Sequence, residues 1–317
     1  MLHSRGFPDV IRRIATESAL ATLLIAALAV PGAFAAPPGF AFLEVPAGAR
    51  ASAMGGAYIA LADGVEAAFW NPAGLSGVQG TQLSATHFEY FQNLRHEQFA
   101  LGGRMFGGGV AASLRAMYTE PIEERDDLGN LVGTFGAHDL ELQLGYGRKT
   151  AGGTSVGVAA QVVRERISSE SAMTWGMSAG VAWQPRIWRD LRASLAVQHL
   201  GPSANYVIDG EKGSPVGLPA AMHTGIALHR DLGRGLALTP ALDVRATLGR
   251  SPVVALGGEL ESESGASLRL GYRQGDDIAN VSVGLGWRYR LYRVDYAWVP
   301  SKLDLGDTHR FSFGAQF

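Results

Sequence analysis

From residue 81 to its end the chain repeats one pattern: segments of about ten residues in which apolar side chains alternate with small or polar ones. In one of these segments Met173, Trp175 and Met177 share one parity, while Thr174 and Gly176 share the other. Successive side chains of a β-strand point to opposite faces of the sheet, so this period of two predicts strands with one apolar face. A helix with an apolar stripe is excluded, because it requires a period of 3.6 residues.

The alternating segments predict an all-β fold with an even number of strands. The connections after odd-numbered strands include the long polar stretches 119–136 and 201–217, whereas those after even-numbered strands are short. Short turns at one end and longer loops at the other are typical of outer-membrane β-barrels. We therefore expect a 14-stranded antiparallel transmembrane β-barrel over residues 81–317, with strands at 81–91, 95–104, 108–118, 137–147, 153–165, 172–183, 190–200, 218–230, 234–246, 252–261, 266–273, 279–290, 291–299 and 307–317.

A soluble β-sandwich is the alternative fold, and it would bury the apolar parity between two sheets. Three features favour the barrel: the segment length of about ten residues, an export signal at residues 1–35, and aromatic residues near segment ends such as Trp183, Tyr272 and Trp298. Aromatic girdles at the two membrane interfaces explain that placement. A closed barrel also leaves no unpaired backbone groups in lipid.

Residues 1–35 have the features of an export signal. Arg12 and Arg13 supply positive charge, residues 19–30 form an apolar run, and Ala33 and Ala35 place small residues before a cleavage point. At 1.5 Å per residue the run spans about 18 Å, short of the roughly 30 Å of a hydrocarbon core. We therefore expect cleavage after Ala35, export through the inner membrane of a Gram-negative bacterium, and residence in the outer membrane.

Residues 36–80 do not alternate and are rich in small side chains. We expect this segment to fold as a hatch inside the barrel, with a short helix near residues 60–68, because fourteen strands would otherwise enclose a water-filled lumen. Asn71 is expected to cap a tight turn ahead of Pro72, which has no backbone N–H. The alternative is that Asn71-Pro72-Ala73 pins the hatch to the wall until a ligand arrives.

The stretch FLEVPAGARASAMGGAYIALADGVEAAFWNPAGLSG at 42–77 resembles the N-terminal signature of the PorV/PorQ family, within the superfamily of the long-chain fatty acid transporter FadL. The motifs HLGPS at 199–203, LGYRQGDD at 270–277 and VDYAWVP at 294–300 extend the similarity along the chain. The resemblance implies a fourteen-stranded barrel plugged by an N-terminal hatch, with Asn71, Pro72 and Ala73 as the hatch motif.

Two functions follow from the resemblance. The fatty-acid branch of the superfamily carries hydrophobic molecules inward through a lateral opening in the wall, and the PorV branch shuttles exported proteins in type IX secretion. The loops of this chain are short for a protein-shuttling member, which favours passive transport of a hydrophobic small molecule over a PorV-like accessory role.

Enzymatic motifs lack their required context. Residues 176–180 match G-x-S-x-G, but Ser178 lies within a predicted strand rather than at a strand-to-helix elbow. The eight His have no metal-ligand spacing, and there is no Cys. A net charge of −2 does not favour a nucleic-acid partner. We expect no enzyme activity, cofactor, metal or nucleic acid.

Charged residues on the small-residue parity should face the lumen, because an Arg facing lipid at the midplane costs roughly 2–4 kcal/mol. They are candidates either for an ion network that grips the hatch or for a polar path around a ligand. These residues are Arg115, Asp139, Glu141, Asp243, Arg245, Glu259, Arg269, Arg273, Arg293 and Asp295.

The last segment alternates through Phe311 and Phe313 and ends on Phe317. A terminal Phe after an alternating strand is similar to the recognition signal of the outer-membrane assembly machinery. We expect Phe313 and Phe317 to form this insertion signal. The expected partners are that machinery, membrane lipids, and a hydrophobic small molecule or exported proteins.

Overall fold

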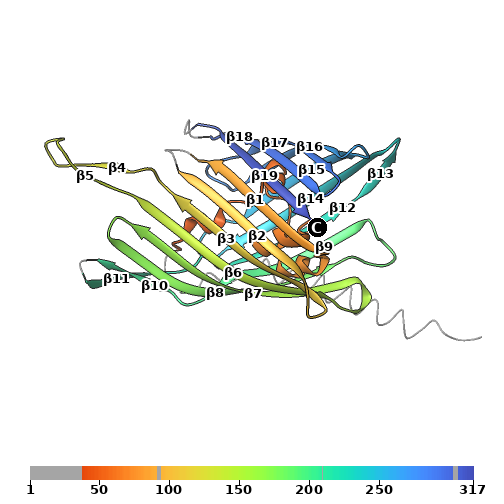
Figure 1. Cartoon of the computed structure of the whole chain (residues 1–317), viewed down its shortest axis with the longest axis horizontal. Helices are drawn as coiled ribbons and strands as arrows, with labels where there is room; N and C mark the ends of the chain where they lie inside the picture. The colour runs from red at the N-terminus through yellow and green to blue at the C-terminus, as the bar shows by residue number, and fades with distance from the viewer. Residues whose placement is uncertain (1–37, 91–93, 209, 303–305) are drawn as a thin grey trace, which may run out of the picture. The chain divides into compact units, whose positions relative to one another are not determined.

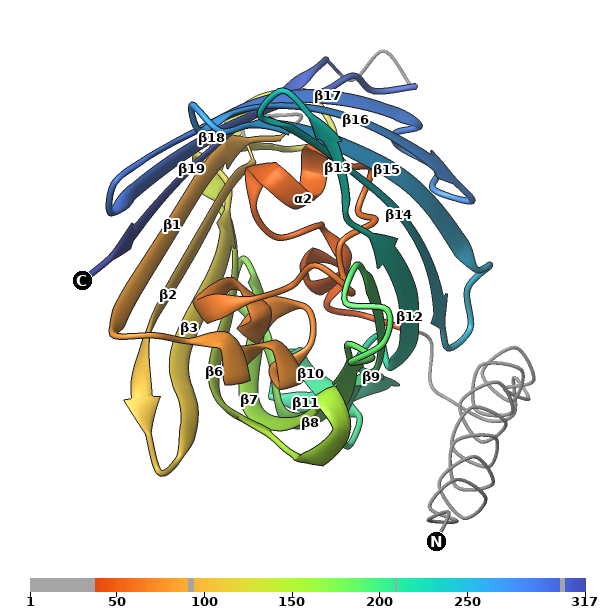
Figure 2. The ribbon, with the colours of Figure 1, turned by 90° about the vertical axis from the view of Figure 1, so that its right-hand side faces the viewer.

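Fourteen antiparallel strands close into a barrel in the computed structural model (Figures 1 and 2). The model describes residues 38–90, 94–208, 210–302 and 306–317, so the predicted export signal at 1–35 lies outside the described residues. Each barrel strand pairs with the next one along the barrel, and β19 pairs with β1 from Gln82–Gln316 to Phe88–Arg310. The sheet therefore has no free edge, and the predicted fold class is confirmed.

The barrel strands agree with the predicted segments to within three residues at every end. They are β1 (Thr81–Glu89), β2 (Arg95–Met105), β3 (Gly108–Tyr118), β6 (Ala137–Lys149), β7 (Thr154–Ile167), β8 (Glu170–Trp183), β9 (Leu191–Leu200), β12 (Ala221–Leu228), β14 (Leu236–Thr247), β15 (Val253–Ser262), β16 (Ala266–Gln274), β17 (Val281–Tyr289), β18 (Tyr292–Val299) and β19 (Thr308–Gln316).

Five further short strands extend the barrel or its loops. The long connection after β3 contains the hairpin β4 (Ile122–Arg125) and β5 (Leu131–Phe135), and the one after β9 contains β10 (Ala204–Ile208) and β11 (Glu211–Val216). β13 (Arg230–Gly233) folds back on β14. The sequence predicted loops here, because these strands are too short to show an alternating pattern.

The two ends of the barrel differ in their connections. We call the end at which β1 finishes the loop end, since the connections 119–136, 201–220 and 275–280 lie there. We call the opposite end, where β1 begins and β19 finishes, the turn end. Its connections are short, as in 106–107 and 290–291.

The wall separates an apolar outside from a polar inside. Along β8, Trp175 is 55% exposed, and Met173 and Met177 are exposed with it, whereas Thr174 and Ser178 are buried. Ser178 Oγ accepts a hydrogen bond from the backbone N–H of His199, so it sits in a strand and not at a catalytic elbow. No helix among the described residues is long and apolar enough to cross a membrane.

The N-terminal segment, residues 38–80, lies inside the barrel (Figure 2). It contains the 3-10 helices η2 (Ala41–Glu44), η3 (Gly64–Phe69) and η4 (Pro72–Gly77) and the short α-helix α2 (Ala49–Ala53). The short helix predicted near 60–68 is present as the 3-10 helix η3, which begins later than predicted, at Gly64, and the α-helix α2 comes earlier in the chain. Gly64, the first residue of η3, has a φ of +65°. An α-helix cannot continue through a residue in this left-handed conformation.

Inward-facing amides and hydroxyls of the wall bind the backbone of the N-terminal segment. Gln98 accepts from Gly48 N–H at 2.8 Å, Ser312 accepts from Ala49 N–H at 2.7 Å, and Gln198 donates to the carbonyl of Trp70 at 2.7 Å. A segment with so little regular structure needs partners for its buried backbone groups, and the wall provides them.

Candidate ligand cavity

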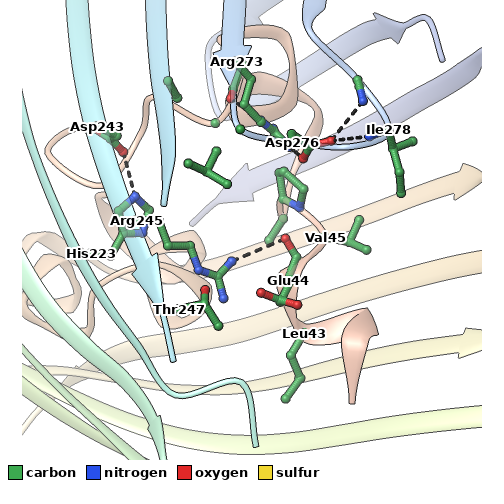
Figure 3. Close-up of a pocket in the computed structure, with 18 of the residues that line it drawn as sticks. Leu43, Glu44, Val45, His223, Asp243, Arg245, Thr247, Arg273, Asp276 and Ile278 are labelled. Carbon is green, nitrogen blue, oxygen red and sulfur yellow. Dashed lines mark hydrogen bonds and ion pairs between the residues drawn. The ribbon is translucent and has the colours of Figure 1, made fainter. Parts of the chain in front are cut away.

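A cavity of about 450 Å³ lies between the N-terminal segment and the wall, towards the loop end (Figure 3). The segment contributes Leu43, Val45 and Trp70 to its lining, and the strands contribute His223 and Arg245 among others. The connection 275–280 covers part of it. Apolar side chains and a few polar groups together form the kind of site that binds small molecules.

The aromatic side of the cavity is fixed by ring contacts. The Trp70 ring packs edge-on against Tyr58 at 5.5 Å between centroids and lies 5.7 Å from the His223 ring. Its indole N–H donates to the carbonyl of Ala47 at 3.1 Å. Trp70 is therefore held in one orientation and presents a rigid apolar surface.

Three arginines of the wall hold the backbone of residues 43–46. Arg115 donates to the carbonyl of Leu43 at 2.7 Å, Arg245 to that of Glu44 at 3.4 Å, and Arg310 to that of Pro46 at 3.3 Å. Arg245 is the least satisfied, because its buried Nε and Nη2 have no hydrogen-bond partner among the described residues. The cavity therefore offers unused N–H donors beside its apolar surface.

Asp243 fixes the turn of the segment beneath the cavity. Its Oδ2 accepts from the backbone N–H groups of Tyr58 and Ile59, both at 2.8 Å, and lies 3.1 Å from Nε2 of His223. The side chain is buried at 2% exposure. One wall carboxylate thus secures two consecutive amides of the segment.

Asp276 organises the connection that covers the cavity. Its Oδ2 lies 2.8 Å from Nη1 of Arg273, and its Oδ1 accepts from the backbone N–H groups of Ile278 and Ala279. Arg273 in turn donates to the carbonyl of Gly55 in the N-terminal segment at 2.7 Å. Burial opposes the charge of Asp276, but Arg273 and the two amides outweigh it and hold the pKa of this carboxyl below its usual value.

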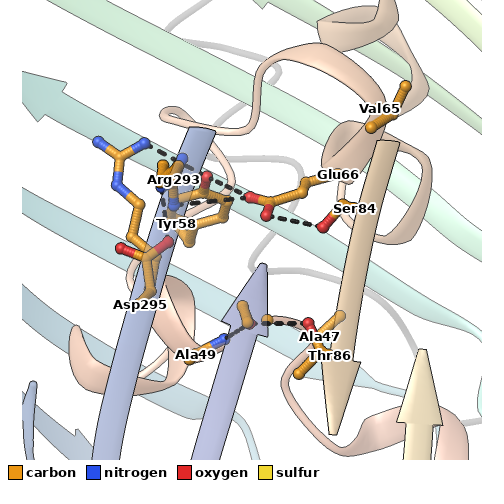
Figure 4. A network of polar contacts seen from close by, with 12 residues as sticks. Ala47, Ala49, Tyr58, Val65, Glu66, Ser84, Thr86, Arg293 and Asp295 are labelled. Atoms are coloured by element: carbon orange, nitrogen blue, oxygen red, sulfur yellow. Dashed lines mark hydrogen bonds and ion pairs between the residues drawn. The ribbon is translucent and has the colours of Figure 1, made fainter. Parts of the chain in front are cut away.

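A second group of charges joins the N-terminal segment to the wall, and Figure 4 shows Glu66, Arg293 and Asp295 from this group. Arg50 Nε lies 2.8 Å from Oε2 of Glu259, and Arg269 bridges Glu259 at 2.5 Å and Asp295 at 2.8 Å. The three cations Arg50, Arg269 and Arg293 therefore face the three anions Glu66, Glu259 and Asp295, with Arg293 lying 2.6 Å from Asp295 and 3.9 Å from Glu66. We call these six residues the charge network.

Two hydroxyls complete the charge network. Tyr58 OH donates to Glu66 at 3.2 Å, and Ser84 Oγ donates to its other oxygen at 3.0 Å. Burial raises the pKa of Tyr58, so the phenol keeps its proton and stays a donor. Buried charges are tolerated when they are balanced and hydrogen-bonded, as they are here.

The predicted lumen-facing residues fall into three places. Arg115, Asp243, Arg245 and Arg273 line the cavity, with Glu141 paired to Arg115 at 3.3 Å. Glu259, Arg269, Arg293 and Asp295 belong to the charge network. Asp139 joins neither group, lies half-buried on β6 away from the cavity lining, and has no partner for its Oδ1 among the described residues.

The hatch motif lies away from the cavity. Asn71 Oδ1 accepts from the backbone N–H of Ala73 at 3.0 Å ahead of the η4 helix, so the predicted cap is present. Its Nδ2 donates to the carbonyl of Val181 on β8. Gly180 makes room for this contact, because a Cβ there would overlap the Asn71 amide.

Several residues of the site were not predicted from the sequence. Trp70, His223 and Asp276 escaped notice because their roles depend on contacts between distant segments. Arg50 and Glu66 carried a signal that could have found them, because they are charged residues within a stretch of small and apolar ones.

We compared the sequence and the fold with those of known proteins. A family model described as an uncharacterised protein family (UPF0164) matches residues 30–187, slightly less than half of the chain. No curated protein sequence matches it. Many solved structures have a similar fold, and they include transporters of aromatic hydrocarbons.

The toluene transporter TbuX of Ralstonia pickettii is 14% identical, with a TM-score of 0.55 over 85% of this chain and 98% of its own. The toluene transporter TodX of Pseudomonas putida is 11% identical, with a TM-score of 0.55 over 84% of this chain and 95% of its own. The chain therefore shares the barrel fold of these transporters. CymD, a monoaromatic hydrocarbon channel, is similar at 14% identity and a TM-score of 0.55 over 85% of this chain and 97% of its own.

Proposed function

We propose that the protein is an outer-membrane channel that carries a hydrophobic small molecule passively across the membrane. The observation that carries this proposal is the cavity enclosed between the N-terminal segment and the wall, with its Trp70 surface and unused Arg245 donors. The fold shared with TbuX, TodX and CymD supports it, since those proteins are described as toluene transporters or as a monoaromatic hydrocarbon channel. The predicted export signal at residues 1–35 supplies the route to the outer membrane.

In this proposal the N-terminal segment acts as a hatch. A ligand enters from the loop end, occupies the cavity, and competes for the arginines that hold the carbonyls of residues 43–46. Release of those carbonyls loosens the segment and opens a way past it. The described chain contains no group of His, Cys, Asp and Glu that could hold a metal ion, and the route needs no chemical step.

Uptake by liposomes containing the purified protein tests the proposal. We expect faster entry of a long-chain fatty acid than in empty liposomes, because its carboxylate can accept hydrogen bonds from the arginines. Val253 lines the cavity, so Val253→Trp should lower uptake by about tenfold or more because the larger ring fills the space. Leu256→Trp is the matched control on the same strand, because Leu256 points outward and is exposed. Equal uptake by all samples, including empty liposomes, would refute transport.

A PorV-like accessory role is the second candidate, and one observation favours it. The β4–β5 hairpin at the loop end exposes Leu128, Leu131 and Val132, with Leu128 exposed at 86%. Exposed apolar side chains of this kind are typical of protein contacts. Co-purification of exported proteins with the wild type, but not with a Leu128→Ser/Val132→Ser variant, would support this role.

A further inference from the structure

The two ends of the barrel carry opposite charge. The six connections of the turn end and their flanking residues contain ten Arg and Lys against four Asp and Glu, counted over 103–109, 147–155, 183–193, 229–236, 261–266 and 287–292. The described residues of the loop-end connections show the reverse, with eleven Asp and Glu against six Arg and Lys, counted over 89–95, 118–137, 166–171, 200–221, 247–253, 274–281 and 299–308. The turn end is therefore a basic rim.

The turn after β8 shows the pattern most clearly. Arg186 and Arg189 flank Ile187 and Trp188, and Arg192 follows as the second residue of β9. Ile187 is 69% exposed and Trp188 is 66% exposed. Apolar side chains that protrude beside unpaired cations have no partner within the described chain, so the turn is suited to a surface that is apolar and anionic at once.

The other turns repeat this combination. The turn after β6 carries the exposed Arg148 and Lys149, and the one after β17 carries Arg290 next to the exposed Leu291 and Tyr292. Among the described residues only two of the ten basic side chains pair with a carboxylate, Arg230 with Asp190 and Arg288 with Glu261. Of the remaining eight, all but the half-buried Arg192 are exposed and available to an external anion.

We propose that the basic rim binds the anionic phosphate headgroups of the phospholipid leaflet that borders the turn end. Arginine matches phosphate oxygens with parallel N–H donors, and each basic side chain near an anionic surface adds roughly fivefold to binding. Tyr and Trp belong at the same depth, between headgroups and acyl chains. The inference rests on the proposal that the wall spans a bilayer, but not on transport.

Placement along the wall favours lipid over a protein partner. The basic residues come from turns on several sides of the barrel, in the connections after β2, β6, β8, β12 and β17, rather than from one patch. At the end of β17 the exposed, lipid-facing Trp287 and Tyr289 alternate in sequence with Arg288 and Arg290. A leaflet surrounds a barrel on all sides, whereas a docked protein covers one side.

Lipid titration of the full-length processed protein tests the proposal. Delipidated protein in a neutral detergent is titrated with phosphatidylglycerol or phosphatidylcholine carrying brominated acyl chains, and quenching of tryptophan fluorescence reports binding. A Trp188→Phe variant shows how much of the fluorescence quenching comes from Trp188. We expect the concentration of phosphatidylglycerol at half-saturation to be lower than that of phosphatidylcholine by about tenfold or more. This preference should weaken as the salt concentration is raised from about 0.05 M to about 1 M.

Charge-neutralising variants locate the contact. Arg186→Gln/Arg189→Gln/Arg192→Gln should reduce the preference for phosphatidylglycerol at least about fivefold. Arg148→Gln/Lys149→Gln tests a second turn in case the first variant misfolds, and folding is checked by the heat-dependent shift of the barrel in gel electrophoresis. The matched loop-end control, Arg125→Gln/Arg166→Gln/Lys212→Gln, should keep the wild-type preference.

Three outcomes would overturn the proposal: equal affinity of the wild type for the two lipids, equal loss in the loop-end control, or displacement of the lipid by inorganic phosphate at the same phosphate concentration. The last would indicate a site for free phosphate instead of a leaflet. Uptake measured with the same variants should be unchanged, so a failed transport assay would leave this inference standing.

Discussion

Asp243 shows how single wall residues determine the path of the N-terminal segment. Its carboxylate accepts two consecutive backbone N–H groups from a segment that has no sheet or long helix of its own. Hydrogen bonds to a charged acceptor are worth about 1.5–3 kcal/mol each, more than neutral ones. The inward parity of the strands therefore carries the information that folds the segment.

Asp276 gives the cavity cover a dependence on pH. Its pKa is held below the usual value in the folded protein, so its contribution to stability is complete above the unfolded value of about 3.9 and is lost as the pH falls through the folded value. We expect the thermal midpoint of the wild type to fall more between about pH 5 and about pH 2 than that of Asp276→Asn.

The neighbouring residue provides the control for this measurement. Asp277→Asn removes an exposed carboxyl that makes none of these contacts among the described residues, and its midpoint should follow the wild type. If Asp276→Asn and the wild type lost stability in parallel, the bonds of Asp276 to Arg273 and the two amides would not be linked to folding.

The sequence predicted which charges avoid lipid, but not all of their partners. Arg115 lies directly opposite Glu141 across two neighbouring strands, and Glu259 lies opposite Arg269 in the same way. Such pairs can be found from the strand pattern, because antiparallel neighbours are related by the turn between them. The contact of Arg50 with Glu259 could not be predicted in this way, since it joins the N-terminal segment to a strand residue 209 positions away in the chain.

At the scale of elements, the charge network joins the N-terminal segment to the three strands β15, β16 and β18. Arg50→Gln leaves an unbalanced negative charge, and we expect a loss of about 1.5–3 kcal/mol in unfolding free energy together with a larger leak of ions through planar bilayers. Arg50→Gln/Glu259→Gln restores the balance. It should be less destabilised than the sum of the two single variants in a double-mutant cycle.

An exposed pair serves as the control for the charge network. Arg125 and Glu123 lie 2.6 Å apart on β4, both more than half exposed. Neutralising both should change stability by less than about 1 kcal/mol, because surface ion pairs contribute little. Strict additivity of the Arg50 and Glu259 variants would contradict a coupled network.

The outward face of the strands should tolerate charge only near the ends of the barrel. Trp175→Arg places a cation on the lipid-facing side of β8, and we expect it to cost roughly 2–4 kcal/mol and to lower the yield of folded barrel in lipid vesicles. Trp188→Arg, in the turn at the end of the same strand, should cost about 1 kcal/mol or less. Similar yields of the two variants would contradict the assignment of the lipid-facing parity.

The strands were predictable because lipid imposes a strict rule on every barrel residue. The β4–β5 hairpin and the N-terminal segment obey no such rule. Their structure depends on local pairing or on contacts with the wall, so the short helix expected near 60–68 begins only at Gly64 and is a 3-10 helix. Backbone groups of the N-terminal segment bind Gln98, Gln198 and Ser312 of the wall. The conformation of the segment therefore depends on the wall, and its own sequence predicts little of it.

At the scale of the whole molecule, the last residue closes the barrel. The backbone N–H of Phe317 donates to the carbonyl of Thr81, and Thr81 donates back to Phe317. Deleting Phe317 removes both bonds and the terminal ring, and we expect a lower yield of protein inserted into outer membranes. Phe317→Ser keeps the backbone bonds, so a fall in its yield would attribute insertion to the ring itself. Normal insertion of both variants would remove the C-terminal signal.

The enclosure of the N-terminal segment sets the order of events during biogenesis. The residues that fill the lumen precede all the barrel strands in the chain, and β19, which pairs with β1, follows the other strands. The segment contacts β2, β9, β14 and β19, and these contacts exist only once it lies inside the barrel. We expect the segment to take its place before β1 and β19 pair, so a chain stopped before that point would expose both the lipid-facing side chains of its strands and their inward-facing polar ones.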